Sequence, residues 1–273
     1  MNAPRLSALL LGAALGTAAC QSNTAPTETA AAGAPATSLT PGPWRGELTA
    51  QGQSIPFLFE VKEEAGRPVV YLINQGLSGE ERLRCAEITT AGDSTTIHLG
   101  KFDAALVLRA AGPDMLKGTW VKYDSKTPFR IPLTATRGAQ PLFPATKRDS
   151  RGEFGGNWRA TFVGKGGRSY PATGVFTQKD SALTGTFRSA SSDYRLSGNV
   201  DGQELRLSRF DGNQALLFTA RNGPPEPIDI TKEYAPNTLF GYFYSGTSDH
   251  ETWTAVPDPT AQLPNNGVPT PKH

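Results

Sequence analysis

The histidines are the first residues to consider for acid–base or metal chemistry, and this chain of 273 residues has only three. His250 lies between Asp249 and Glu251, just before the last expected strand, and such a group could coordinate a divalent metal. A metal site needs three or four convergent ligands, and no second histidine or cysteine is near in sequence. We therefore interpret His250 as a turn residue. His98 is expected on the solvent side of a strand, and we predict no metal site.

The two cysteines, Cys20 and Cys85, are the other candidates for chemistry. Cys85 follows Arg84 and lies near Arg82, and neighbouring cations can lower the pKa of a thiol and make it reactive. A buried, unreactive thiol is the alternative interpretation. No Cys-x-x-Cys motif occurs, so dithiol–disulfide exchange within this chain is excluded.

The N-terminal residues predict an export signal over residues 1–19. A short basic start precedes an apolar run over residues 6–19, which is too short to span a bilayer. The small residues before Cys20 resemble the lipobox of bacterial lipoproteins, although Thr17 stands where those proteins favour leucine. The resemblance implies that Cys20 becomes the first mature residue and carries a lipid such as palmitate. An ordinary secretory signal, cut at the same place, is the alternative.

Residues 20–41 are rich in Thr, Ala, Pro and Gly and contain almost no charged or large apolar residues. Such a segment cannot bury enough surface to order itself, so we expect a flexible tether. The mature protein is therefore predicted to be held by its lipid anchor to a membrane of the bacterial cell envelope, on the periplasmic face or at the cell surface.

Composition and missing motifs exclude several function classes. The 27 basic and 25 acidic residues nearly cancel, which gives no reason to expect nucleic acid as a partner. The sequence has no Gly-x-Ser-x-Gly, no His-Glu-x-x-His and no dinucleotide fingerprint. The glycines at 164–167 fall between two expected strands and indicate a hairpin turn, not a phosphate-binding loop. We predict no catalytic residue and no cofactor; a carboxylate pair for glycoside cleavage remains an open alternative.

Internal repetition is the strongest structural signal in the sequence. Four segments return in the same order with small insertions at turns. The matched pairs are Gly42-Pro43-Trp44-Arg45 with Gly156-Asn157-Trp158-Arg159, Ser54-Ile55-Pro56 with Ser169-Tyr170-Pro171, Lys101-Phe102-Asp103 with Arg209-Phe210-Asp211, and Ala105-Leu106-Val107-Leu108 with Ala215-Leu216-Leu217-Phe218.

Each repeat reads as a series of short strands rich in Val, Leu, Phe, Tyr and Thr, separated by turn residues. Leu205 and Leu207 alternate with polar neighbours, which is typical of a half-buried strand. About eight such strands in a row predict an all-β meander that can close into an up-and-down barrel. The Gly-x-Trp start of each repeat resembles that of lipocalin- and avidin-like barrels. We therefore predict two small or half-open barrels, with one large sandwich or a shared sheet as the alternative.

The pattern also predicts the domain boundaries. The first repeat spans residues 42–137, a linker spans 138–155, and the second repeat spans 156–257. Residues 258–273 are predicted to be a disordered tail. The second repeat has an extension over residues 222–238, which is a candidate lid or binding loop or an insertion without a role.

Large aromatic residues are the candidates for a binding site in barrels of this kind. Trp44, Trp158 and Trp253 could line a pocket or close a barrel end, and Tyr242, Phe243 and Tyr244 could line an opening; the alternative is that all of them are core residues. A small apolar ligand or an envelope protein is the expected partner.

The mature chain is also similar to the N-terminal region of TlpA-like thiol–disulfide reductase lipoproteins. The segments that carry this resemblance are Tyr170–Phe176, Leu196–Asn199, Ala215–Ala220 and His250–Trp253. In those proteins a lipid anchor and a β-rich region precede a thioredoxin-like domain that does the redox chemistry. Because this chain stops where that domain would begin, the resemblance implies a shared scaffold and compartment without the catalytic residues. A redox component that acts with a separate thioredoxin-like partner is the alternative to a binding or accessory lipoprotein.

Overall fold

The computed structural model describes residues 39–77, 79–124, 126–144, 152–224, 228, 231 and 233–263. These residues belong to one compact unit that spans residues 35–273. The predicted signal peptide, Cys20, most of the predicted tether and residues 264–273 lie outside the described residues. Apart from one 3₁₀ turn, η1 (Lys165–Gly167), every regular element described is a β-strand, so the all-β prediction is confirmed.

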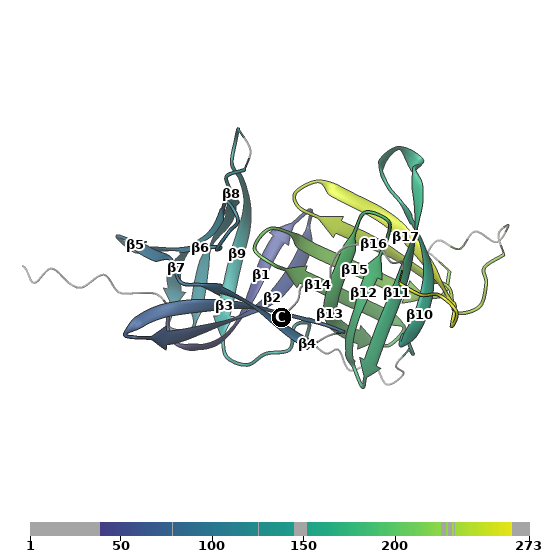
Figure 1. Cartoon of the computed structure of the whole chain (residues 1–273), viewed down its shortest axis with the longest axis horizontal. Helices are drawn as coiled ribbons and strands as arrows, with labels where there is room; N and C mark the ends of the chain where they lie inside the picture. The colour runs from purple at the N-terminus through teal and green to yellow at the C-terminus, as the bar shows by residue number, and fades with distance from the viewer. Residues whose placement is uncertain are drawn as a thin grey trace, which may run out of the picture. The chain divides into compact units, whose positions relative to one another are not determined.

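The first repeat forms a curled sheet of nine antiparallel strands, which we call the open module (Figure 1). Its order, β4-β3-β2-β1-β9-β8-β7-β6-β5, leaves β4 and β5 as the two edges although they are consecutive in sequence. The strands are β1 (Gly42–Ala50), β2 (Gln53–Glu64), β3 (Arg67–Gly76), β4 (Gly79–Cys85), β5 (Ile88–Ala91), β6 (Ser94–His98), β7 (Ala104–Gly112), β8 (Met115–Lys122) and β9 (Phe129–Arg137).

The second repeat forms a closed barrel of eight antiparallel strands, which we call the closed barrel. Its first and last strands pair along six positions, from Trp158 opposite Pro257 to Val163 opposite Thr252, and this pairing removes both edges. The strands are β10 (Gly156–Val163), β11 (Ser169–Lys179), β12 (Ala182–Arg188), β13 (Asp193–Asp201), β14 (Glu204–Phe210), β15 (Ala215–Asn222), β16 (Leu239–Ser245) and β17 (Asp249–Pro257). The prediction of tandem barrel-like modules is thus confirmed, with one module closed and one half-open.

The two Gly-x-Trp segments have the same local structure in both modules. The indole nitrogen of Trp44 donates a hydrogen bond of 2.9 Å to the carbonyl of Thr40, and that of Trp158 donates one of 2.9 Å to the carbonyl of Phe154. In both cases the acceptor lies four residues before the tryptophan. Gly42 and Gly156 precede these tryptophans with φ angles of +125° and +103°, which favour glycine. This shared geometry supports the repeat that the sequence predicts.

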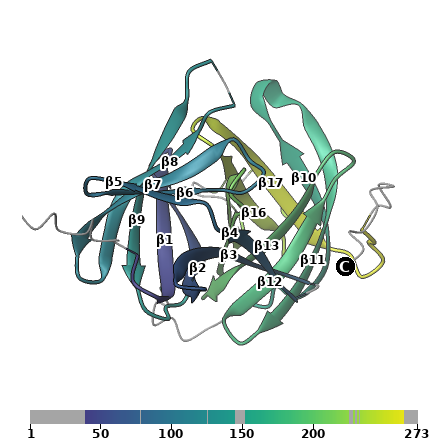
Figure 2. The same ribbon diagram turned by 60° about the vertical axis from the view of Figure 1, so that its left-hand side comes forward.

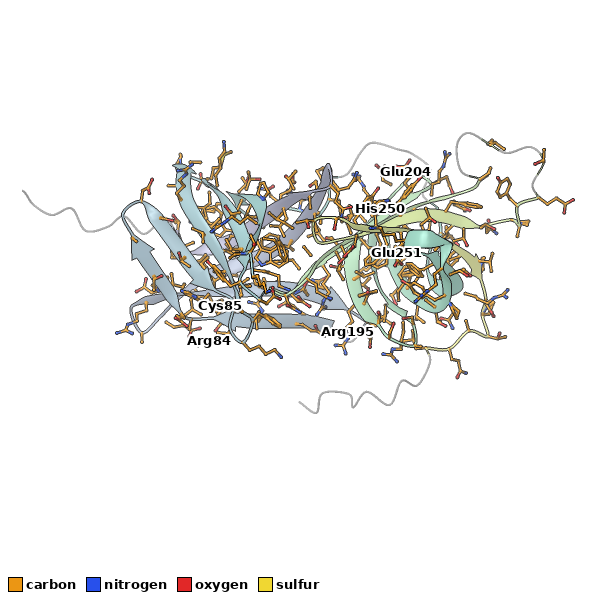
Figure 3. All side chains as sticks on the ribbon, turned by 90° about the horizontal axis from the view of Figure 1, so that it is seen from above. Arg84, Cys85, Arg195, Glu204, His250 and Glu251 are labelled. Atoms are coloured by element: carbon orange, nitrogen blue, oxygen red, sulfur yellow. The ribbon has the colours of Figure 1, made fainter. Side chains whose placement is uncertain are left out.

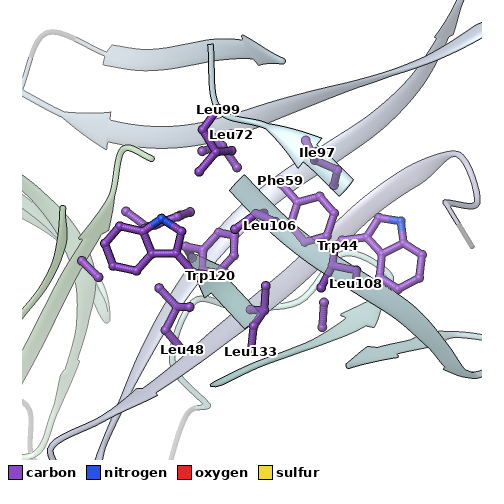
Figure 4. Packing of buried hydrophobic residues seen from close by; sticks show 14 of the residues in the cluster. Trp44, Leu48, Phe59, Leu72, Ile97, Leu99, Leu106, Leu108, Trp120 and Leu133 are labelled. Carbon is purple, nitrogen blue, oxygen red and sulfur yellow. The ribbon is translucent and has the colours of Figure 1, made fainter. Parts of the chain in front are cut away.

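The closed barrel completes the hydrophobic core of the open module. Buried residues from every strand of the open module except β5, among them Trp44, Phe59 and Trp120, form that core (Figure 4). Phe210, Ala215 and Leu217 belong to the same cluster although they come from β14 and β15. They lie on the outer face of the barrel, because their neighbours Leu216 and Phe218 face its interior.

The β14–β15 hairpin is held against the open module by polar contacts as well. The amide of Asn74 pairs with the backbone of Phe210, donating to its carbonyl at 2.9 Å and accepting from its N–H at 3.3 Å. Ser208 donates a hydrogen bond of 2.7 Å to the carbonyl of Pro56. A Cβ atom on Gly212, in the hairpin turn, would lie 3.3 Å from Leu83 at the end of the sheet. Figure 2 shows the two modules side by side from a second direction.

Segments outside the strands also pack into the cores. Leu39, at the end of the predicted tether, and Phe143, in the predicted linker, are buried in the core of the open module. Phe154, also in the predicted linker, is buried in the core of the barrel. Asp258–Ala261, at the start of the predicted tail, form a turn in which the N–H of Asp258 donates to the carbonyl of Asn157.

Candidate functional site

The closed barrel has one plugged end and one open end. At the plugged end, Trp158 is buried against Phe154 and Phe176, and the backbone N–H of Phe154 donates to the Gln178 side chain at 2.8 Å. At the opposite end lie the last residues of β10, β12, β14 and β16 and the first residues of the strands that follow them. We call this second end the mouth of the barrel.

The barrel interior is filled by aromatic rings rather than by an empty cavity. Phe162 stacks on Trp253 with ring centres 6.0 Å apart, Phe187 stacks on Phe218 at 5.4 Å, and Phe218 meets Phe243 at 4.4 Å. Close packing of this kind leaves no room for a ligand at the barrel centre. A binding site on this module therefore has to lie at the mouth.

A pocket of about 600 Å³ does open at the mouth. Phe243 and Tyr194 form its apolar floor, with their ring centres 5.3 Å apart. Its walls come from the ends of β10, β16 and β17 and from η1, and the lining residues are Val163, Gly164, Lys165, Gly167, Tyr194, Phe243, Ser245, Ser248, Asp249, His250, Glu251 and Thr252. A concave site with an aromatic floor and a few polar groups is the usual form of a small-molecule site.

Glu251 is a polar residue of this pocket whose side chain is fixed by a hydrogen bond from inside the barrel. It faces inward because Trp253, two residues further along β17, is a core residue. The Tyr170 hydroxyl donates a hydrogen bond of 2.5 Å to Glu251 Oε2, and the Tyr170 ring stacks on Phe162 at 5.4 Å. Burial, followed by the bond to Glu251, raises the pKa of Tyr170, so the phenol stays protonated and keeps donating.

The second carboxylate oxygen of Glu251 lies beside Gly164. A Cβ atom on residue 164 would be only 3.0 Å from Glu251 Oε1. Oε1 therefore packs against Gly164, where a larger residue would crowd the carboxylate, and in the described part of the chain it accepts no hydrogen bond from another residue.

The β16–β17 turn, which carries one side of the mouth, is fixed by a residue of the open module. Gln51 Nε2 lies 3.2 Å from the carbonyl oxygen of Ser245, 3.2 Å from that of Gly246 and 3.1 Å from that of Asp249. The open module thus positions the turn beside the pocket through one amide group.

The predicted binding aromatics divide between the core and the outer surface. Trp44, Trp158 and Trp253 are buried core residues, and Trp158 closes one barrel end. Tyr242 is 52% exposed on the outer face of β16, and the half-buried Tyr244 packs toward the core of the open module. Of the six aromatic residues named as candidates, only Phe243 lines the mouth pocket.

Tyr194 and Glu251 were missed as pocket residues, although the sequence carries a signal for them. Residues of equal parity on a strand share a face, so Glu251 lies with Trp253 and Tyr194 lies with Leu196 inside the barrel. What the sequence could not reveal is which end of the barrel stays open.

Cys85 lies at the end of β4 with its side chain buried in the core of the open module. Arg82 and Arg84 point to the opposite, solvent-exposed face of β4, where they pair with Glu60 and Glu64. Burial without a neighbouring cation raises the pKa of the Cys85 thiol to about 11. The two arginines that suggested a reactive thiol therefore do not activate it.

The two histidines that the structure describes lie on different modules. His250 is exposed at the start of β17, within the strand instead of the expected turn, with its ring 6.4 Å from that of Tyr244. His98 ends β6 and is half-buried, on the face opposite the core residues Ile97 and Leu99, which is the side on which the sequence placed it. Among the residues that the structure describes, no three His, Cys, Asp or Glu side chains are grouped as a metal site would require. Figure 3 labels His250 and Glu251 on the closed barrel and Cys85 on the open module.

Comparison with known proteins identifies no family for this chain. The sequence matches no known protein family, and no curated protein matches it. Among solved structures, it is similar to a protein of unknown function from the DUF3598 family of Nostoc punctiforme, with a TM-score of 0.27 and 10% sequence identity over 79% of this chain and 95% of that protein. That similarity carries no information on function. No helix in the described part of the chain is long and apolar enough to cross a membrane.

Proposed function

We propose that this protein is a non-enzymatic lipoprotein of the bacterial cell envelope that binds a small molecule at the mouth of its closed barrel. The observation that carries the binding role is the mouth pocket, where Tyr194 and Phe243 form an apolar floor beneath Glu251. The lipid anchor at Cys20 is proposed from the N-terminal sequence alone.

The position of the pocket supports binding more than catalysis. One carboxylate, Glu251, is fixed at the mouth by Tyr170, and a single fixed carboxylate with an aromatic floor can orient a ligand. Acid–base hydrolysis of a glycoside would need a second carboxylate with a different pKa held opposite the first. The only other carboxylate among the residues that line this pocket is Asp249, which is exposed at the start of the same strand and two residues from Glu251.

The redox alternative loses its physical basis in the environment of Cys85. A thiol that exchanges disulfides has to be accessible and partly ionised, whereas Cys85 is buried and its pKa is raised to about 11. The resemblance to the N-terminal region of TlpA-like lipoproteins remains a prediction about scaffold and compartment.

The binding role can be tested by fluorine NMR with a library of small fluorinated fragments that includes neutral, cationic and anionic members. Ser245 lines the pocket and Thr254 is exposed on the outer face of β17, so Ser245→Trp fills the mouth and Thr254→Trp is the matched control. We expect fragments that bind the full chain to lose binding in Ser245→Trp and to keep it in Thr254→Trp. Binding that persists in Ser245→Trp, or no binding by any fragment, would contradict the proposal.

The anchor can be tested by metabolic labelling with a clickable fatty acid. We expect label and membrane association to be lost in Cys20→Ser and kept in Cys85→Ser, because only the first cysteine follows the signal sequence. Equal labelling of the Cys20→Ser protein would exclude a lipid on this residue.

A further inference from the structure

We infer that the mouth pocket takes an organic cation, namely an ammonium group on a small apolar body such as a methylated amine. This inference rests on the proposed function and names the ligand class for the same site.

The charges at the mouth favour a cation. The lining residues include two carboxylates, Asp249 and Glu251, and one lysine, Lys165. Glu251 is held in place by Tyr170, and its Oε1 lies against Gly164, where a larger residue would crowd the carboxylate. Lys165 lies on the surface turn η1, where its long side chain is exposed and can extend into solvent. The fixed charge at the pocket is therefore negative.

The aromatic floor strengthens the same preference. Ring faces carry negative electrostatic potential, and quaternary ammonium ligands are recognised by clustered aromatic side chains. Tyr194 is half-buried at the floor, and its ring centre is 5.3 Å from that of Phe243 and 5.7 Å from that of Phe218. A ligand cation at the mouth would lie between these rings and the Glu251 carboxylate, and would gain from both.

Other charged ligands fit the pocket less well. An anion would meet two carboxylates, and Lys165, the one lysine among the lining residues, is exposed. A bare metal ion would need several oxygen or nitrogen ligands around it, and no group of three such residues exists in the described parts of the chain. An organic cation needs only one carboxylate and a ring surface, which this pocket supplies.

The test compares three probes of one shape and different charge on the full chain: choline, its neutral isostere 3,3-dimethylbutan-1-ol, and the anion 3,3-dimethylbutanoate. Affinity is measured by NMR titration, with the amide signals of residues 163–167 and 248–252 reporting the site. We expect choline to bind at least about tenfold more tightly than the neutral isostere. That advantage is expected to shrink as salt is raised, because salt screens the attraction.

Three variants locate the effect. Glu251→Gln keeps the shape and the acceptor for Tyr170 but removes the charge, so we expect the choline preference to disappear. Glu153→Gln changes the same charge near the plugged end of the barrel and is expected to have no effect. Lys165→Gln removes an exposed opposing charge, cannot disturb the core, and is expected to tighten choline binding about threefold.

The outcomes separate this inference from the proposed function. If the neutral or anionic probe binds the mouth as tightly as choline, or if Glu251→Gln leaves the preference intact, the cation inference fails while the binding role stands. If no probe shifts the mouth signals and no fluorinated fragment binds there, both fail.

Discussion

The open module and the closed barrel are built from the same meander, and one connection decides which of them closes. In both, the first strand pairs with the last, β1 with β9 and β10 with β17. In the barrel, β13 and β14 are joined by a tight turn at Gly202-Gln203 and pair directly. At the equivalent place in the open module, β5 and its flanking residues are inserted, and β4 and β5 become the two sheet edges.

The difference shows that a sheet can stay open at its edges and still have a complete hydrophobic core, provided that a neighbouring module supplies the missing side chains. The closed barrel fills its interior with its own side chains. The open module instead buries Phe210, Ala215 and Leu217 from the neighbouring hairpin. We therefore expect stability to be asymmetric, because the open module depends on the barrel and the barrel does not depend on the open module.

Separating the modules should have the largest effect. We expect the fragment 152–263 to fold alone, with a dispersed NMR spectrum, and the fragment 39–144 to remain unfolded or aggregated because its core loses the hairpin that completes it. A well-folded 39–144 fragment would show that the hairpin is dispensable and would break the comparison.

Two phenylalanines allow a matched test within the intact chain, since Phe210 and Phe218 are both fully buried. Phe210 packs on Phe57 at 4.5 Å and on Trp120 at 5.1 Å in the open module, whereas Phe218 lies inside the barrel. Each change to alanine should cost about 3–5 kcal/mol. In hydrogen exchange we expect Phe210→Ala to lower the protection of backbone amides in β1–β9 only. We expect Phe218→Ala to lower it in both modules. Equal loss of protection in both modules from Phe210→Ala would show that they unfold as one unit.

The buried Cys85 thiol should make the stability of the open module depend on pH. Its pKa is raised from 9.0 to about 11 in the folded protein, so the folded state keeps a proton that the unfolded chain releases. Stability should be unaffected below pH 9 and should fall by up to about 3 kcal/mol as pH rises from about 9 to 11. The Cys85→Ala protein lacks this dependence. The free energy of unfolding is measured with urea at each pH for both proteins, and the difference between them excludes the contribution of the tyrosines. Identical pH dependence in the two proteins would mean that the thiol is accessible to water.

The smallest expected effect comes from the ion pairs between the modules. Glu81 of β4 pairs with Arg195 and, at 3.4 Å, with Arg209 of the barrel. Its neighbour Glu80 pairs with Arg82 on the same strand, at 2.6 Å, and with no barrel residue among those described. We expect Glu81→Gln to destabilise the open module by about 0.5 kcal/mol at low salt and by less at high salt, and Glu80→Gln to do nothing measurable to docking. A salt-independent loss would indicate packing rather than charge.

Most of the strand positions could be predicted from the sequence, because alternation and turn residues act locally. Leu205 and Leu207, whose alternation with polar neighbours predicted a half-buried strand, lie on β14 (Glu204–Phe210) and are both buried. The inward position of Glu251 could have been read from its spacing to Trp253. The open end, by contrast, depends on which strand ends meet in space, and Tyr170 reaches Glu251 across 81 positions of the chain.

By itself, the sequence determined the all-β class, the repeat and the paired Gly-x-Trp starts, since each follows from nearby residues and the backbone conformations they favour. Only the tertiary structure decided that one module stays open, that a hairpin of the other completes its core, and that Cys85 is shielded from the arginines beside it. These features depend on pairing and packing between residues far apart along the chain. The free energy of such contacts comes from surfaces that meet only after folding.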